Sequence, residues 1–113
     1  MPPDQGQLPV IWVDNSIIRE HFNNGHIVDR AISGDLYSIV GKSKHRIPPP
    51  PGEPICTKSQ MINYYTLNGG NLVASAHQYL RPDGSIGGSG LPDPKRLVLQ
   101  DRILAVRSTS PRR

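Results

Sequence analysis

Twelve prolines and eleven glycines interrupt this chain of 113 residues, and they limit how long any helix or strand can be. Proline fixes φ and removes a backbone donor, whereas glycine favours turns and weakens the interior of helices and strands. The densest run is Pro48–Pro51, followed by Pro54, which predicts an extended polyproline II segment. Together with the basic residues before it, this run predicts an exposed connector over residues 42–56 within a single domain, 1–113. Residues 1–8 and 108–113 are expected to fray as chain ends.

The apolar pattern between these breaks predicts short helices and strands. Runs of β-branched residues and alternating patterns predict strands over residues 10–13, 36–40, 71–80, 97–99 and 103–106. Helical spacing, with capping residues before it and glycine after it, predicts helices over residues 17–22, 26–32 and 60–67. Residues 26–32 also fit one arm of a hairpin, and we favour the helix. The predicted fold class is α+β, a small single sheet of about four to five strands with two or three short helices, mostly on one side.

Large aromatic side chains are few, and we expect the largest of them inside the molecule. Trp12 and Phe22 stand in apolar runs and are predicted to belong to the core. Tyr64 and Tyr65 are adjacent on the predicted third helix, so they cannot both face inward. The outward one could stack on a nucleic-acid base, although a half-exposed tyrosine on a helix is also ordinary.

The formal charge of +4 conceals an uneven distribution of charged side chains. Residues 1–40 hold two basic and five acidic side chains, whereas residues 41–113 hold eleven basic and four acidic ones. A basic surface concentrates phosphate-bearing polymers and speeds their association, although mild basicity also serves solubility. The imbalance predicts nucleic acid or another polyanion as a partner of the C-terminal two thirds.

Localisation and redox state are read from the same sequence. The N-terminal residues show no basic segment followed by an apolar one, and the longest apolar run is far shorter than the roughly 18–20 residues that cross a bilayer. Cys56 is the single cysteine, so the chain holds no internal disulfide. We therefore expect a cytoplasmic protein without a membrane partner; the oligomeric state is left open.

A glycine-rich segment at residues 84–90 is the first candidate for binding phosphate. Without Cβ atoms, Gly87 and Gly88 let backbone amides approach an anion closely. Lys95 and Arg96 follow the segment, and the connector adds further cations: Lys42, Lys44 and Arg46. An ordinary flexible connection between strands has the same composition.

His77, Tyr79 and Arg81 occupy alternate positions of one predicted strand and form the strongest candidate catalytic set. Alternate residues of a strand emerge on one face, about 6.5–7 Å apart. In a metal-independent endoribonuclease, a histidine transfers the proton, an arginine stabilises the charge of the phosphorane, and a tyrosine stacks or donates. His45, in the basic connector, could serve as the second acid or base. The same residues also fit a solvent-facing strand with no catalytic role.

No residue pattern predicts a metal or a cofactor. His21 and His26 are five residues apart and do not share a helical face, and Cys56 has no Cys or His nearby in sequence. The triplet Gly41-Lys42-Ser43 lacks the earlier glycine of a phosphate loop, since Leu36 stands there. We therefore expect neither.

Three functional hypotheses follow from these residues. The preferred one is a small basic module that binds nucleic acid, RNA rather than DNA, or another polyanion. The first alternative is the toxin-like endoribonuclease that uses His77 and Arg81 with Tyr79 and His45. The second alternative is a protein-interaction module without chemistry, in which Pro48–Pro51 docks a protein partner because the segment is already extended.

Overall fold

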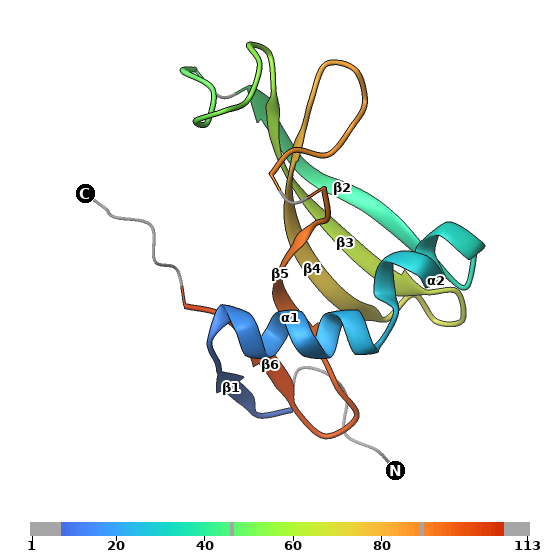
Figure 1. The fold of residues 1–113 in the computed structure, drawn as a ribbon. Coiled ribbons are helices and arrows are strands. Elements are labelled where there is room, and N and C mark those ends of the chain that lie inside the picture. Colours follow the sequence, from blue (N-terminus) through green and yellow to red (C-terminus); the bar gives the residue numbers. More distant parts are fainter. Residues whose placement is uncertain (1–7, 46, 89, 108–113) are drawn as a thin grey trace.

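The computed structural model describes residues 8–45, 47–88 and 90–107, and Figure 1 shows their arrangement. The remaining residues, among them Arg46 and both predicted frayed ends apart from Leu8, lie outside the described ranges. One helical segment in two joined pieces, α1 (Asn15–Asn24) and α2 (Ile27–Ser33), follows the first strand. The strands are β1 (Val10–Trp12), β2 (Leu36–His45), β3 (Lys58–Thr66), β4 (Leu72–Leu80), β5 (Asp93–Val98) and β6 (Ile103–Ala105).

All six strands form one mixed sheet in the order β1-β6-β5-β4-β3-β2. Strands β2 to β6 are antiparallel neighbours, and β1 adds to β6 in parallel. The class is α+β, but the expected four to five strands and two or three helices are wrong. The described residues contain six strands, and their helical part is a single segment in two joined pieces, α1 and α2.

The error lies in residues 60–67, which were expected to form a helix, whereas residues 60–66 belong to strand β3. The apolar side chains of this segment, with Tyr64 and Tyr65 side by side, fit either pattern when the segment is taken alone. Antiparallel pairing with β2 on one edge and β4 on the other satisfies the backbone of β3 as a strand. Long-range pairing therefore overrides the local helix signals.

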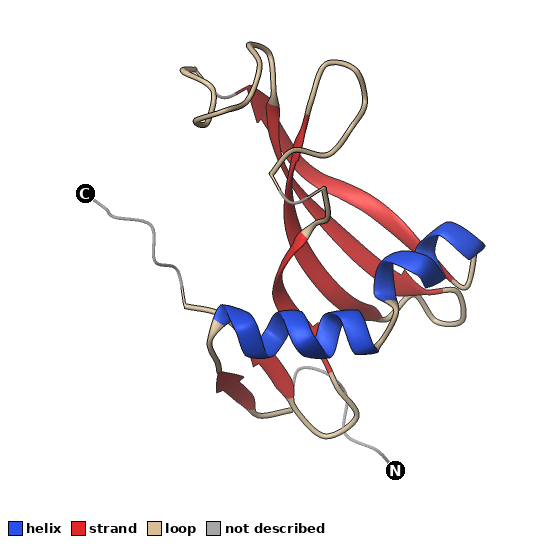
Figure 2. Cartoon of the chain, viewed as in Figure 1, coloured by secondary structure: helices blue, strands red, loops and turns tan. Residues whose placement is uncertain are grey.

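The two helical pieces are joined by a sharp change of backbone direction. Gly25 ends α1 as expected, and His26 adopts a left-handed conformation with φ 55° before α2 begins. Gly34 then ends α2 with φ 94°, a conformation that glycine adopts without strain. Figure 2 shows both pieces lying on the same face of the sheet.

The hydrophobic core lies between this helical segment and the sheet. Ile18, Phe22 and Ile27 come from the helices, and Phe22 meets Tyr64 edge to face with ring centroids 6.1 Å apart. The sheet contributes the other buried members: Leu36, Tyr64, Ala74, Ala76, Leu97 and Leu104. The prediction that Phe22 belongs to the core is thus confirmed. Of the tyrosine pair, Tyr64 is the inward one, with 3% of its surface exposed.

Strand β1 forms where it was expected, but it is exposed rather than buried. Trp12 is 52% exposed and lies outside the core, which corrects its predicted place. Because β1 is the short outer strand of the sheet, no further strand among the described residues covers it. The guanidinium of Arg107 covers part of the indole instead, 5.1 Å from the ring centroid, as a cation–π contact.

Strand β2 is longer than expected and reaches into the predicted connector. It continues through Lys42 and Lys44 to His45, with an irregularity in register between Val40 and Lys42. The connecting loop proper is therefore the shorter stretch between His45 and Lys58. Within the described ranges, we find no helix with the length and apolarity that crossing a membrane requires.

Candidate functional site

The pairing of β4 with the following chain is interrupted at one point. His77 pairs with Asp93 of β5, while two residues further along β4 the carbonyl of Tyr79 accepts a hydrogen bond of 2.8 Å from the amide of Gly87. Between Gly87 and Asp93, the described residues do not pair with β4, so the chain leaves the sheet beside Gln78. Such a departure opens a gap at the edge of β4.

A pocket of about 590 Å³ lies at this gap. Its volume falls within the range of about 300–1,000 Å³ that is usual for small-molecule sites. Candidate residues from three parts of the sequence meet around it: His77, Tyr79, Gly87, Gly88 and Lys95. Helix α1 adds Arg19 and Asn23, and the remaining lining comes from Gln78, Leu91, Pro92 and Asp93. No sequence pattern connects α1 with this region.

His77 and Tyr79 lie against each other on β4, as their alternate positions predicted. Their rings meet edge to face, with centroids 4.7 Å apart and planes at 85°. The Nε2 atom of His77 is hydrogen-bonded to Oγ of Ser59 on β3 at 2.6 Å. Both rings are thus held in fixed orientations, which a binding or catalytic side chain requires.

Asp93 binds two cationic side chains at the border of the pocket. The guanidinium of Arg19 and the ammonium of Lys95 each donate to one of its carboxylate oxygens at 3.0 Å. Burial alone would raise the pKa of Asp93, but the hydrogen bonds from Lys95 and Arg19 outweigh it, so the pKa lies below its ordinary value. Asp93 therefore stays ionised at neutral pH and keeps both cations at the rim.

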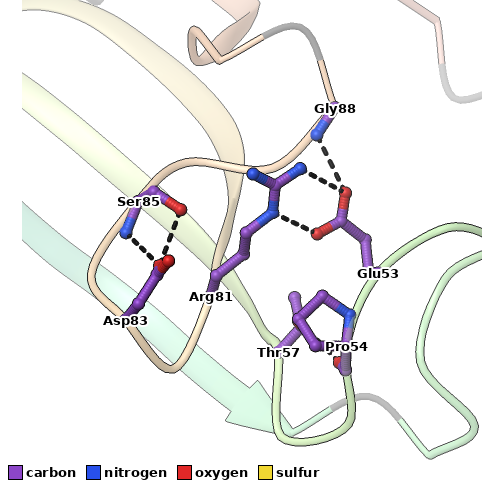
Figure 3. Close-up of polar contacts among 7 residues, drawn as sticks. All are labelled: Glu53, Pro54, Thr57, Arg81, Asp83, Ser85 and Gly88. Carbon is purple, nitrogen blue, oxygen red and sulfur yellow. Dashed lines mark hydrogen bonds and ion pairs between the residues drawn. The ribbon is translucent and has the colours of Figure 1, made fainter.

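Arg81 faces a different partner from the one expected of a catalytic arginine. Figure 3 shows its guanidinium donating to the carboxylate of Glu53 in the β2–β3 loop, at 2.7 Å from Nε and 3.3 Å from the terminal nitrogen. The amide of Gly88 donates to the same carboxylate at 3.0 Å. Only 7% of the Glu53 side chain is exposed. This cluster, Glu53 with Arg81 and Gly88, fastens the β2–β3 loop to the glycine-rich loop.

The electrostatics of this cluster support a structural role for Arg81. The hydrogen bond from Arg81 and then that from Gly88 hold the pKa of Glu53 below its ordinary value, and the carboxylate in turn raises the pKa of Arg81. Glu53 was missed by the sequence analysis, because nothing local relates it to an arginine 28 residues away. The endoribonuclease hypothesis, which uses Arg81 for charge stabilisation, stays a prediction.

Gly87 leaves room for the Glu53 side chain, and its role in binding phosphate stays a prediction. A Cβ atom at this position would stand 2.7 Å from the carboxyl carbon of Glu53, so the site accommodates only glycine without displacing that side chain. Gly88, by contrast, has open space and a φ of 63°. The backbone amide of Gly88 is already bound to Glu53, so the amides of this segment are used in part to hold the loop.

Lys42 and Lys44 share one face of the sheet with His77 and Tyr79. The register aligns Lys42 with Met61 and then His77, and it aligns Lys44 with Ser59 and then Tyr79. Residues directly opposite each other in a sheet project to the same side. A hollow of about 190 Å³ lies between the side chains of β2 and β3 here, lined by Lys42, Ser43, Lys44, Ser59 and Met61.

This face is the one that the helices leave uncovered. The core residues Tyr64, Ala74 and Ala76 alternate along β3 and β4 with the residues that share the face of His77, and they face α1. Arg96 is paired with Ser75 and therefore also belongs to the uncovered face. Arg46, the third predicted connector cation, lies outside the described residues.

The register also shows that His45 lies apart from His77. His45 pairs with Lys58, whereas His77 pairs with Met61, so the two histidines project from opposite faces of the sheet. Among the residues that the structure describes, no three His, Cys, Asp or Glu side chains lie close enough together to hold a metal ion. The structure thus brings His77 together with Tyr79, but not with His45.

The proline run lies in the loop between β2 and β3. The Thr57 side chain, which is fully buried, anchors the end of this loop by donating to the carbonyl of Pro54 at 2.8 Å. The amide of Glu53 donates to the carbonyl of Pro50 at 3.0 Å. A protein partner for Pro48–Pro51 stays a prediction.

The chain was also compared with known proteins. A scan against models of protein families, a search of curated proteins and a search of solved structures each found no match.

Proposed function

We propose that the protein binds nucleic acid, RNA in preference to DNA, or another polyanion, along the uncovered face of the sheet. The observation that carries this proposal is the register of β2, β3 and β4. It aligns two lysines of the edge strand with the His77 and Tyr79 pair, so cations that are distant in sequence share one surface. Arg96 extends the same surface on β5.

The charge of this face favours an anionic ligand. Among the strand residues of β2 to β5 that share it, Asp93 is the one carboxylate, and Arg19 and Lys95 already occupy its oxygens. Ser75 and Asn63 of this face are neutral and satisfy each other, because the Ser75 hydroxyl donates to the Asn63 carbonyl oxygen at 2.6 Å. Lys42 and Lys44 are exposed on the outermost strand, where a polymer backbone can reach them.

The test is a titration of a fluorescently labelled RNA 12-mer and of the matching DNA at several salt concentrations. Each phosphate neutralised on a single strand contributes about 0.7 to the slope of log affinity against log salt. The double variant Lys42→Ala with Lys44→Ala is therefore expected to bind more weakly and to lower that slope by about 1.4.

A matched control removes the same charge from elsewhere. Lys58 projects from the opposite face, and Arg102 pairs with Asp101 in the β5–β6 turn. The double variant Lys58→Ala with Arg102→Ala should keep the parent's slope. Affinity that is insensitive to salt, or an equal loss in both double variants, would contradict the proposal.

A further inference from the structure

Two tyrosines on the uncovered face are not explained by attraction to phosphate alone. Tyr37 of β2 is paired with Tyr65 of β3, and their rings stack with centroids 5.3 Å apart and planes at 23°. Tyr65 is half-buried, whereas Tyr37 is 40% exposed. Their register places them on the same face as Lys42 and Lys44.

The stack has a free side because of where it lies in the sheet. Strand β2 is the outermost strand, so no neighbouring strand of the described chain covers Tyr37 on the side away from Tyr65. The hydroxyl of Tyr37 stands 3.2 Å from where a Cβ of Gly70 would be, and Gly70 has a φ of 60°. The β3–β4 turn thus leaves room for this ring and limits its movement. A third flat ring can add to the exposed end of the pair.

We propose that the bound polymer is a single-stranded nucleic acid, with one of its bases stacked on the Tyr37–Tyr65 pair. This inference rests on the proposed function and names its substrate class. A duplex keeps its bases paired and stacked inside, so it offers an aromatic platform at most the outer faces of its two terminal base pairs. A single strand offers both an exposed base and a backbone, and proteins that bind single strands combine aromatic rings with cations in the same way.

The spacing of the groups fits one strand running along β2. Their β3 partners Tyr65 and Met61 are four residues apart, so Tyr37 and Lys42 lie about 13 Å apart along the sheet. A base on the tyrosine stack can therefore belong to the same polymer whose phosphates meet Lys42 and Lys44. A second copy of this chain fits less well, because Lys42 and Lys44 lie on the same face as the stack and like charges across an interface repel.

The experiment compares three ligands and two variants. The ligands are labelled single-stranded RNA of 12 adenines, an RNA duplex of 12 base pairs, and heparin, a polyanion without bases. The variants are the double change Tyr37→Leu with Tyr65→Leu, and the control Trp12→Leu. Trp12 is also an exposed aromatic residue, but it belongs to β1 at the opposite edge of the sheet.

We expect the parent to bind the single strand more tightly than the duplex. The double tyrosine variant should lose about 5- to 150-fold in affinity for the single strand, since stacking of a base contributes about 1–3 kcal/mol. Its affinity for heparin should equal that of the parent, and Trp12→Leu should leave all three affinities unchanged. Circular dichroism of each variant confirms that the fold is kept.

The outcomes separate this inference from the proposed function. If none of the three polyanions binds, the proposed function itself fails. If the duplex binds as tightly as the single strand, or if the tyrosine variant binds the single strand like the parent, polyanion binding stands and base stacking is rejected. If sedimentation shows a dimer that the tyrosine change converts to monomer, the stack is an interface between copies, and the inference is likewise rejected.

Discussion

Different forces hold the strands together at the two ends of the sheet. Under α1 and α2 the sheet is packed against an apolar core, in which Ile18 and Phe22 are almost completely buried. Beyond the helices, the same strands are joined by polar contacts. Gln60 donates to Ser43 at 3.1 Å and accepts from Gln78 at 3.0 Å. Glu53 joins the β2–β3 loop to the glycine-rich loop. Stability therefore belongs mainly to the covered end, and the candidate binding residues belong mainly to the other.

The covered end should be the more sensitive to loss of side-chain volume. Phe22→Ala removes a ring that is 2% exposed and leaves a cavity beneath α1. We expect the free energy of unfolding to fall by about 3–5 kcal/mol, measured by urea denaturation. A loss below about 1 kcal/mol would show that the helical segment adds little to the fold.

The hydrogen bonds that join Gln60 to Ser43 and Gln78 should be the next most sensitive feature. Gln60 is 7% exposed, and Gln60→Leu would leave Ser43 and Gln78 without their shared partner. We expect a loss of about 1–3 kcal/mol in the free energy of unfolding. The control Gln100→Leu alters an exposed residue of the β5–β6 turn and should change stability by less than about 0.5 kcal/mol.

The loop cluster should make stability depend on acid pH. The pKa of Glu53 is lowered in the folded state by Arg81 and then Gly88, so its contribution is complete above the unfolded pKa of about 4.3 and is lost as pH falls through the folded value. We expect the urea midpoint of the parent to drop more steeply below that pH than the midpoint of Glu53→Gln. The part of the drop that both share comes from Asp83 and Asp93, whose pKa values are also lowered. Parallel curves for the two proteins would rule out a contribution from Glu53.

Gly87 provides an independent way to disturb the same cluster without changing charge. A Cβ in Gly87→Ala would stand 2.7 Å from the Glu53 carboxyl group, so the carboxylate must move away from Arg81 and Gly88. The variant should show the same reduced acid dependence as Glu53→Gln. Gly84→Ala, in a position with open space, strains the backbone but leaves Glu53 in place, and its acid dependence should match that of the parent.

The smallest effect on stability is expected on the uncovered face. Ile39 is paired with Asn63 and is 50% exposed. Ile39→Ala should lower the free energy of unfolding by less than about 1 kcal/mol, because half of the Ile39 surface stays in contact with water in the folded protein. A loss as large as that of Phe22→Ala would mean that this face is packed rather than open, and would remove the contrast between the covered and the uncovered parts of the sheet.

Much of the fold was predictable from sequence where local signals and tertiary structure agree. The first helix, β4 and the β5–β6 hairpin formed as expected, since apolar spacing and turn residues mark them. Strand β3 was mistaken for a helix, because its pairing with β2 and β4 depends on residues distant in sequence. Trp12 was placed in the core from its hydrophobicity, although β1 lies at the edge of the sheet.

The candidate site was predictable only in part for a similar reason. The alternation along β4 correctly paired His77 with Tyr79, since the spacing of a strand is local. Arg81 follows the same alternation, but its partner Glu53 comes from another loop. Arg19 reaches the pocket from α1 through Asp93, a contact between residues 74 positions apart. No local pattern reports such contacts.

The position of β2 as a long outermost strand has a consequence for how copies of the protein behave in concentrated solution. Its outer row of backbone donors and acceptors has no partner strand in the described sheet, which is the arrangement that invites another chain to add. Lys42 and Lys44, with the irregular register before them, resist such addition by repulsion and by bending the strand. Neutralising both lysines thus removes a safeguard against aggregation, and the double variant must be kept dilute.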